Sequence, residues 1–122
     1  MTPRVSIDVV DVVRQDRVWK VRWRIASEPP IRLTHAAAPH GKFHGDDRDL
    51  DLATPTELAL DVTSTEAPGA ETENTFLILT ADVAGVTRRI LARMRVRVGD
   101  DGTPHPAVER IDVQEVGLDG QG

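Results

Sequence analysis

The sequence predicts an all-β protein of seven or eight antiparallel strands packed as a sandwich, and two patterns carry this prediction. Apolar and polar residues alternate with a period of two in the most regular segments, which is typical of strands with one buried and one solvated face. Turn-favouring residues interrupt the chain about every ten residues, as in antiparallel sandwiches. No segment longer than one turn has the three- and four-residue spacing of an amphipathic helix.

The two clearest strands are VWKVRWRI (18–25) and RILARMRVRV (89–98). Each places apolar residues on one face and basic residues on the other, with Leu91 as the exception. The expected inward residues are Trp19, Val21, Trp23, Ile25, Ile90, Ala92, Met94, Val96 and Val98. The expected outward residues are Lys20, Arg22, Arg24, Arg93, Arg95 and Arg97.

Weaker patterns predict the remaining strands. In RVSIDVVDVV (4–13) the apolar residues change parity after Val9, which indicates a bulge or a strand that changes sheets. ELALDV (57–62) and ERIDVQEV (109–116) alternate, and TFLILTADV (75–83) is apolar enough for a strand covered on both faces. ADVAGV (81–86) predicts a tight hairpin around Gly85.

Other segments are expected to be connections. RQDR (14–17), SEPP (27–30) and GDDGTPHP (99–106) read as turns, and STEAPGAETEN (64–74) as a longer acidic loop. We expect one domain over residues 1–116 and a flexible C-terminal tail over residues 117–122.

The order of these strands, with tryptophans in the second and a hairpin late in the chain, resembles immunoglobulin-like and fibronectin type III-like sandwiches over residues 4–116. The resemblance implies a fold and no functional residue, because the chain has no cysteine for the inter-sheet disulfide and no tyrosine for a tyrosine corner. A small β-barrel is the alternative architecture.

Composition excludes several classes of site. The 122-residue chain has no cysteine, which rules out disulfides, thiolate metal sites and cysteine nucleophiles.

No apolar run approaches the length of a membrane span, and the N-terminal residues lack the uncharged core of a signal peptide. We therefore expect a cytoplasmic protein without membrane contact. No serine-hydrolase, phosphate-binding or dinucleotide motif appears, which favours a non-enzymatic protein without a cofactor.

The net charge of −5 is unevenly distributed. Residues 14–24 carry +4 and residues 88–97 carry +5, whereas residues 46–82 carry −9, with ten acids against Arg48. We expect the outward basic rows to pair with acids across strands. Binding of an acidic protein, or of phosphate or nucleic acid, is the alternative, although few aromatic residues remain for stacking on bases.

The most unusual segment is APHGKFHGDDRDLD (38–51), with His35 just upstream. His35, His40, His44 and Asp47 form a candidate metal site, since imidazole and carboxylate suit zinc, iron or manganese. The alternative is local hydrogen bonding in a polar loop. The spacing of Asp47, Asp49 and Asp51 fails as a calcium loop, because Leu52 and Leu58 occupy the glycine and glutamate positions.

Within that segment, DDRDLDL (46–52) predicts a charged edge strand that contributes Leu50 and Leu52 to the core. Phe43 is expected to anchor a surface loop that displays His40 and His44. The leading hypothesis is a non-enzymatic protein acting through protein–protein contacts or self-association. Its candidate interaction surface consists of His40, Phe43, His44, Lys20, Arg22, Arg24, Arg93, Arg95 and Arg97.

Overall fold

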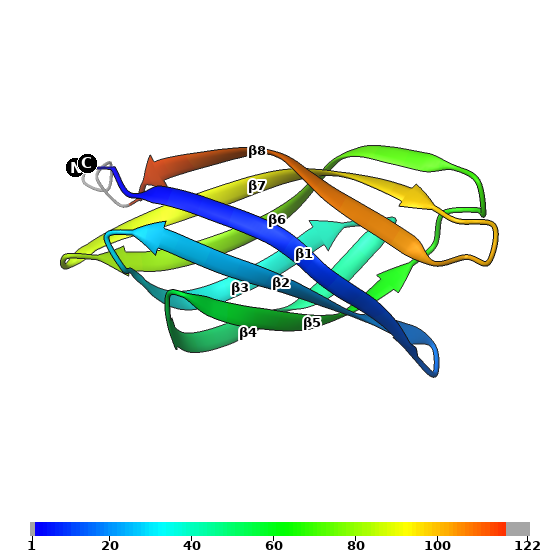
Figure 1. The fold of residues 1–122 in the computed structure, drawn as a ribbon, viewed down its shortest axis with the longest axis horizontal. Coiled ribbons are helices and arrows are strands. Elements are labelled where there is room, and N and C mark those ends of the chain that lie inside the picture. The colour runs from blue at the N-terminus through cyan, green and yellow to red at the C-terminus, as the bar shows by residue number, and fades with distance from the viewer. Residues whose placement is uncertain (1, 117–122) are drawn as a thin grey trace.

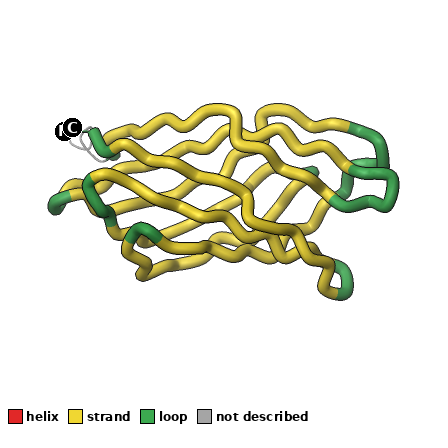
Figure 2. The backbone as a smooth tube through the Cα atoms, viewed as in Figure 1, coloured by secondary structure: helices red, strands yellow, loops and turns green. Residues whose placement is uncertain are grey.

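Eight β-strands and no helix make up residues 2–116, which are the residues that the computed structural model describes (Figures 1 and 2). The strands are β1 (Arg4–Gln15), β2 (Val18–Glu28), β3 (Arg32–His40), β4 (Phe43–Ala53), β5 (Thr56–Ser64), β6 (Glu71–Val83), β7 (Val86–Val98) and β8 (Pro104–Glu115). The predicted tail, residues 117–122, lies outside the described residues.

All eight strands belong to one antiparallel sheet with the order β1-β2-β5-β4-β3-β6-β7-β8. The strands at the two ends of this order, β1 and β8, lie beside each other, so the sheet curls into a nearly closed, barrel-like shape (Figure 1). The predicted all-β antiparallel class and strand number are confirmed, and the barrel alternative fits this arrangement.

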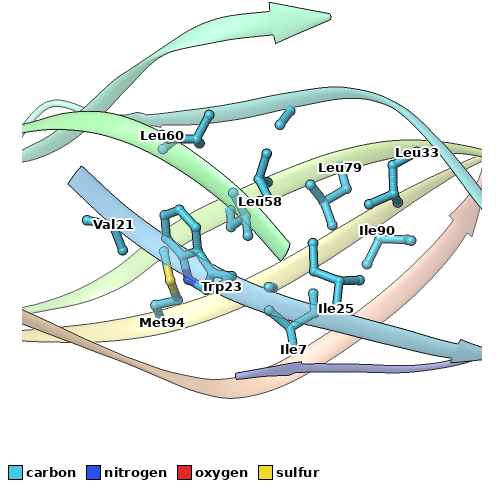
Figure 3. Close-up of a cluster of buried hydrophobic side chains, with 14 of the residues drawn as sticks. Ile7, Val21, Trp23, Ile25, Leu33, Leu58, Leu60, Leu79, Ile90 and Met94 are labelled. Carbon is cyan, nitrogen blue, oxygen red and sulfur yellow. The ribbon is translucent and has the colours of Figure 1, made fainter. Parts of the chain in front are cut away.

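The core fills the inside of the curled sheet (Figure 3). As predicted, β2 and β7 turn their apolar faces inward: Trp23, Ile25, Ile90 and Met94 are fully buried. Trp19 is the exception, because it is only partly buried and the Arg14 guanidinium lies 5.5 Å from the centre of its ring. Burial of this apolar face is the main favourable term that closes the sheet.

The predicted hairpin and bulge are both present. Ala84 and Gly85 join β6 to β7 with φ of 53° and 83°, the pair of positive values that a two-residue type I′ turn requires. Asp82 Oδ1 also accepts a 2.8 Å hydrogen bond from the Gly85 N–H. In β1 the register with β2 shifts between Val9 and Asp11, where the apolar parity changes.

Two predictions about the ends and faces of strands were wrong. β6 begins at Glu71 and β8 at Pro104, so part of the expected acidic loop and part of the expected turn are strand. β6 is covered on one face only: Leu77 and Leu79 are buried, whereas Phe76 and Ile78 lie on the outer face and are partly exposed. Long side chains on β7 shield these two residues in part, since Phe76 pairs with Arg93 and Ile78 with Leu91.

Candidate functional site

The segment expected to be a polar loop is a β-hairpin. β3 and β4 pair on both sides of a two-residue turn at Gly41 and Lys42, and the His40 Nδ1 accepts a 3.1 Å hydrogen bond from the Lys42 N–H. Phe43 is 1% exposed and belongs to the core, so its predicted anchoring role is confirmed, although it anchors a strand and not a loop. The turn reverses the chain between His40 and His44, so these two histidines belong to different strands.

The hairpin separates most of the four predicted metal ligands. His35 contacts Asp47, with Nε2 3.4 Å from Oδ2, and Asp49, with Nδ1 3.0 Å from Oδ1. His44 instead faces Asp46 at 4.0 Å, and His40 stays at the turn. Among residues 2–116 no three His, Asp or Glu side chains gather so as to hold one metal ion. Metal binding therefore stays a prediction, with only His35 and Asp47 in mutual contact.

The contacts of His35 have an electrostatic consequence. Its hydrogen bond to Asp49, followed by that to Asp47, raises the pKa of the imidazole above its usual value, and partial burial opposes the shift. Protonated His35 therefore ties the outer face of β3 to two carboxylates of β4.

Four of the six basic residues in the rows of β2 and β7 pair with acids, so the expected pairing is confirmed in part. On β2, Arg22 pairs with Asp11 and, at 3.5 Å, with Glu57, while Arg24 contacts the other Glu57 oxygen at 3.3 Å. No ion pair is found for Lys20 among the described residues.

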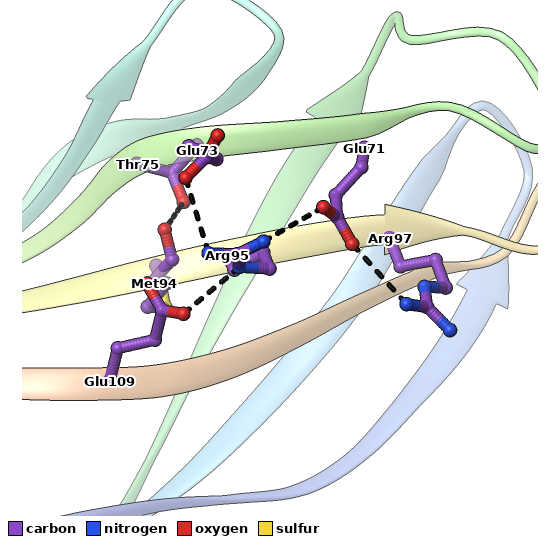
Figure 4. A network of polar contacts seen from close by, with 7 residues as sticks. All are labelled: Glu71, Glu73, Thr75, Met94, Arg95, Arg97 and Glu109. Atoms are coloured by element: carbon purple, nitrogen blue, oxygen red, sulfur yellow. Dashed lines mark hydrogen bonds and ion pairs between the residues drawn. The ribbon is translucent and has the colours of Figure 1, made fainter.

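On β7, Arg95 lies at the centre of a carboxylate cluster (Figure 4). Its guanidinium nitrogens lie 2.9 Å from Glu71, 3.2 Å from Glu73 and 2.9 Å from Glu109, and Arg97 reaches Glu71 at 3.4 Å. These contacts lower the pKa of Glu71, chiefly through the hydrogen bond from Arg95. Arg93 has no ion pair within residues 2–116 and lies between Phe76 and Arg110 in the sheet.

Besides the unpaired end strands β1 and β8, the sheet has a second gap, between β4 and β5, which no sequence pattern predicted. β4 and β5 are joined through Thr54 and Pro55, yet their ladder covers only Phe43–Gly45 against Val62–Ser64. Between that ladder and the turn, residues 46–53 of β4 and 56–61 of β5 run without pairing to each other. We call this gap, bounded by the ladder at one end and the turn at the other, the β4–β5 opening.

Two bulges in β4 explain why the strands separate. Between the pairs Leu33–Leu52 and His35–Asp49, one residue of β3 faces two of β4, and the same happens between Ala36–Arg48 and Ala38–Gly45. Each bulge inserts one extra residue and bends its strand. β4 accordingly uses eight residues (46–53) where β5 uses six (56–61), so β4 bows away from β5.

Charge supports the same separation. β4 carries Asp46, Asp47, Asp49 and Asp51 in this stretch, and the facing part of β5 carries Glu57 and Asp61. Like charges placed directly opposite on neighbouring strands destabilise the pairing. The predicted edge character of 46–52 is therefore confirmed in part, since this stretch pairs with β3 alone although β4 lies inside the sheet.

Gly45 marks the point where the ladder ends. A Cβ at this position would lie 3.1 Å from the Asp61 carbonyl oxygen and 3.5 Å from a Val62 methyl group. The two backbones therefore approach closely beside the opening, at a position where a side chain would push them apart.

Two surface hollows lie along the opening. One of about 340 Å³ is lined by residues 48–52 and 57–59, and one of about 190 Å³ by residues 46–48, 60 and 61. Leu58 and Leu60 are buried beneath them, and Leu50 and Leu52 pack partly against the core. The rim is acidic and exposed, with Asp46, Asp47, Asp49, Asp51, Glu57 and Asp61.

Arg48 lies between the two hollows and lines both. Its guanidinium Nη1 donates a 3.1 Å hydrogen bond to the Ala59 carbonyl oxygen on β5. A side chain thus supplies the donor that a paired strand would supply from its backbone.

The chain matches no family model, no curated protein and no solved structure. Within residues 2–116 there is no helix long and apolar enough to span a membrane.

Proposed function

We propose that this protein is a non-enzymatic, cytoplasmic interaction module that binds a protein partner at the β4–β5 opening. The observation that carries the proposal is the interrupted ladder, which leaves part of the β5 edge facing solvent over an apolar floor. Unpaired strand edges and apolar hollows are surfaces that partner proteins use. The proposed interaction surface is therefore the acidic β4–β5 opening. It replaces the β3–β4 turn and the arginine rows that the sequence suggested.

The proposed fold type is an immunoglobulin-like or fibronectin type III-like sandwich. In the immunoglobulin constant fold, strands A, B, E and D form one sheet and C, F and G the other. The order β1-β2-β5-β4 followed by β3-β6-β7 has the same sequence of strands, with β8 added at the edge. The short β4–β5 ladder departs from this division, because β4 pairs mainly with β3 and so groups with the second sheet.

The alternatives have less support. Arg22, Arg24, Arg95 and Arg97 all contact carboxylates, so a phosphate or nucleic acid would have to compete with those ion pairs. A metal at His35, His40, His44 and Asp47 would require movement of the hairpin, since the contacts of His40 and His44 differ from those of His35.

A position-specific crosslink tests the proposal. Because the chain has no cysteine, Asp61→Cys places a single thiol at the rim and Asp100→Cys places one in the β7–β8 turn. A thiol-linked photocrosslinker in the native host should capture a discrete protein from position 61 and not from position 100. Filling the opening with Ala59→Trp in the same background should remove that product.

Two results would contradict the proposal. One is a set of crosslinked proteins that is the same from both positions. The other is a product from position 61 that survives Ala59→Trp, provided that circular dichroism shows the variant to be folded.

A further inference from the structure

We propose that the β4–β5 opening recognises an arginine side chain of the partner, and that Arg48 is its intramolecular competitor. This inference rests on the proposed function, because it names the group that the opening binds. The reason is that the protein already places one guanidinium there, with Nη1 3.1 Å from the Ala59 carbonyl oxygen.

The β5 edge offers more acceptors than Arg48 uses. In an antiparallel strand the N–H and C=O of one residue face the same neighbour, and successive residues face opposite neighbours. Since the Ala59 carbonyl faces β4, the backbone groups of Glu57 and Asp61 face the same edge. The position of Gly45 agrees with this, because the Asp61 carbonyl oxygen points toward it. A guanidinium group has five N–H donors, so it can bond to one of these carbonyl oxygens and to a neighbouring rim carboxylate at the same time.

The negative charge of the rim favours binding of a positively charged group. Six exposed carboxyl groups surround the opening, and Arg48 is the basic residue between the two hollows. Part of that charge is engaged, since Asp51 pairs with Arg32 and Glu57 with Arg24. Asp61 is exposed and has no ion pair among the described residues, so it remains available to an incoming guanidinium.

The shape of the opening favours a side chain over an added strand. Its ends are closed by the Gly45–Val62 pair and by the Thr54–Pro55 turn, so an extended backbone has no exit in the plane of the sheet. A side chain can enter from outside, between the two strands, and reach the β5 carbonyls to which Arg48 donates from β4. The aliphatic stem of an arginine would then lie over Leu58 and Leu60.

The test uses a short peptide with two arginines and the same peptide with both replaced by citrulline, which has nearly the same shape and no charge. Binding is followed by the NMR shifts of backbone amides 57–61 and by fluorescence anisotropy. We expect the arginine peptide to bind the wild-type protein weakly and the Arg48→Ala variant several-fold more tightly, because the competitor is gone. The citrulline peptide should bind neither protein.

A matched pair of rim variants locates the site. Asp61→Asn should weaken binding of the arginine peptide several-fold, whereas Asp100→Asn, which removes the same charge in the β7–β8 turn, should leave it unchanged. A lysine peptide should bind less tightly than the arginine peptide, because an ammonium group lacks the planar fork.

The inference is overturned if the Arg48→Ala variant binds no more tightly than the wild type, or if citrulline binds as well as arginine. Equal losses in the Asp61→Asn and Asp100→Asn variants would reduce the effect to general charge attraction and would also overturn it. If the peptide fails while position 61 still captures a specific host protein, the proposed function stands and the arginine preference is wrong. If both fail, the proposed function falls as well.

Discussion

Two pairs of neighbouring strands, β6–β7 and β4–β5, differ in how far their ladders extend. Between β6 and β7 the ladder runs from the Glu71–Arg97 pair to the Val83–Val86 turn, and the outward residues include oppositely charged partners. Between β4 and β5 it stops after three pairs, and the outward charged residues on both strands are acidic apart from Arg48. The difference indicates that the outward charges and the extra residues of β4 determine where the β4–β5 ladder stops. The inward apolar pattern does not determine it.

The largest expected effect comes from the core that both sides share. Trp23 is fully buried, pairs with Leu58 of β5 and belongs to the same core cluster as Met94 of β7 (Figure 3). Trp23→Ala should lower the free energy of unfolding by about 3–5 kcal/mol, because it removes that contact with both sides. Urea unfolding followed by circular dichroism measures the loss. A cost below about 1 kcal/mol would mean that the two sides do not share one core.

A pair of leucine truncations compares the two sides directly. Leu79 of β6 is fully buried, so Leu79→Ala should cost about 2–5 kcal/mol. Leu52 beside the opening is only partly buried, so Leu52→Ala should cost less than about 2 kcal/mol. Equal losses in chemical unfolding would show that the floor of the opening is packed as tightly as the closed side.

Gly45 controls where the opening begins. Gly45→Val should cost about 1–3 kcal/mol, because the new side chain meets the Asp61 carbonyl and widens the gap. Hydrogen exchange of amides 62–64 should then become faster. Gly41→Val is the control, since a Cβ at Gly41 has no neighbour within 4 Å. Equal effects of the two substitutions would remove the special role of Gly45.

The smallest expected effect is the dependence of stability on pH through His35. Its pKa is raised in the folded state, so the stabilisation is complete below the unfolded value of about 6.5 and is lost as pH rises through the folded value. The wild-type protein should become less stable over that range, and His35→Asn should lose this part of the pH dependence. Asp49→Asn should reduce it, because that carboxylate makes the largest contribution. Urea midpoints on both sides of neutrality measure it, and parallel profiles for all three proteins would contradict it.

Short-range sequence patterns were sufficient to predict the buried faces of single strands and the turns between adjacent strands. Alternation in β2 and β7 identified their buried faces, and a hairpin was correctly expected around Gly85. The parity change after Val9 left a bulge and a change of sheet as alternatives, and the structure has the bulge. The β3–β4 hairpin was missed because Pro39, Gly41 and Gly45 resemble loop residues. Pro39 and Gly45 belong to strands because of ladders to neighbouring strands, which the residues themselves do not reveal.

The candidate site was less predictable than the fold. The acidic character of 46–51 and the inward leucines were visible in the sequence, and Arg48 stood out as the one base in an acidic stretch. The opening itself depends on β5 pairing with β2 as well as with β4, and on two bulges in the register with β3. Those are relations between distant segments, and no signal within residues 46–61 specifies them.

The place of β5 also has a consequence for the order of folding. The hairpins β1–β2, β6–β7 and β7–β8 join segments adjacent in sequence and can form early, whereas the β2–β5 and β3–β6 ladders must close much longer loops. Insertion of β5 beside β2 is therefore expected to come late, after the rate-limiting step. Truncating Leu58 should then mainly accelerate unfolding, while truncating Ile90 should mainly slow refolding.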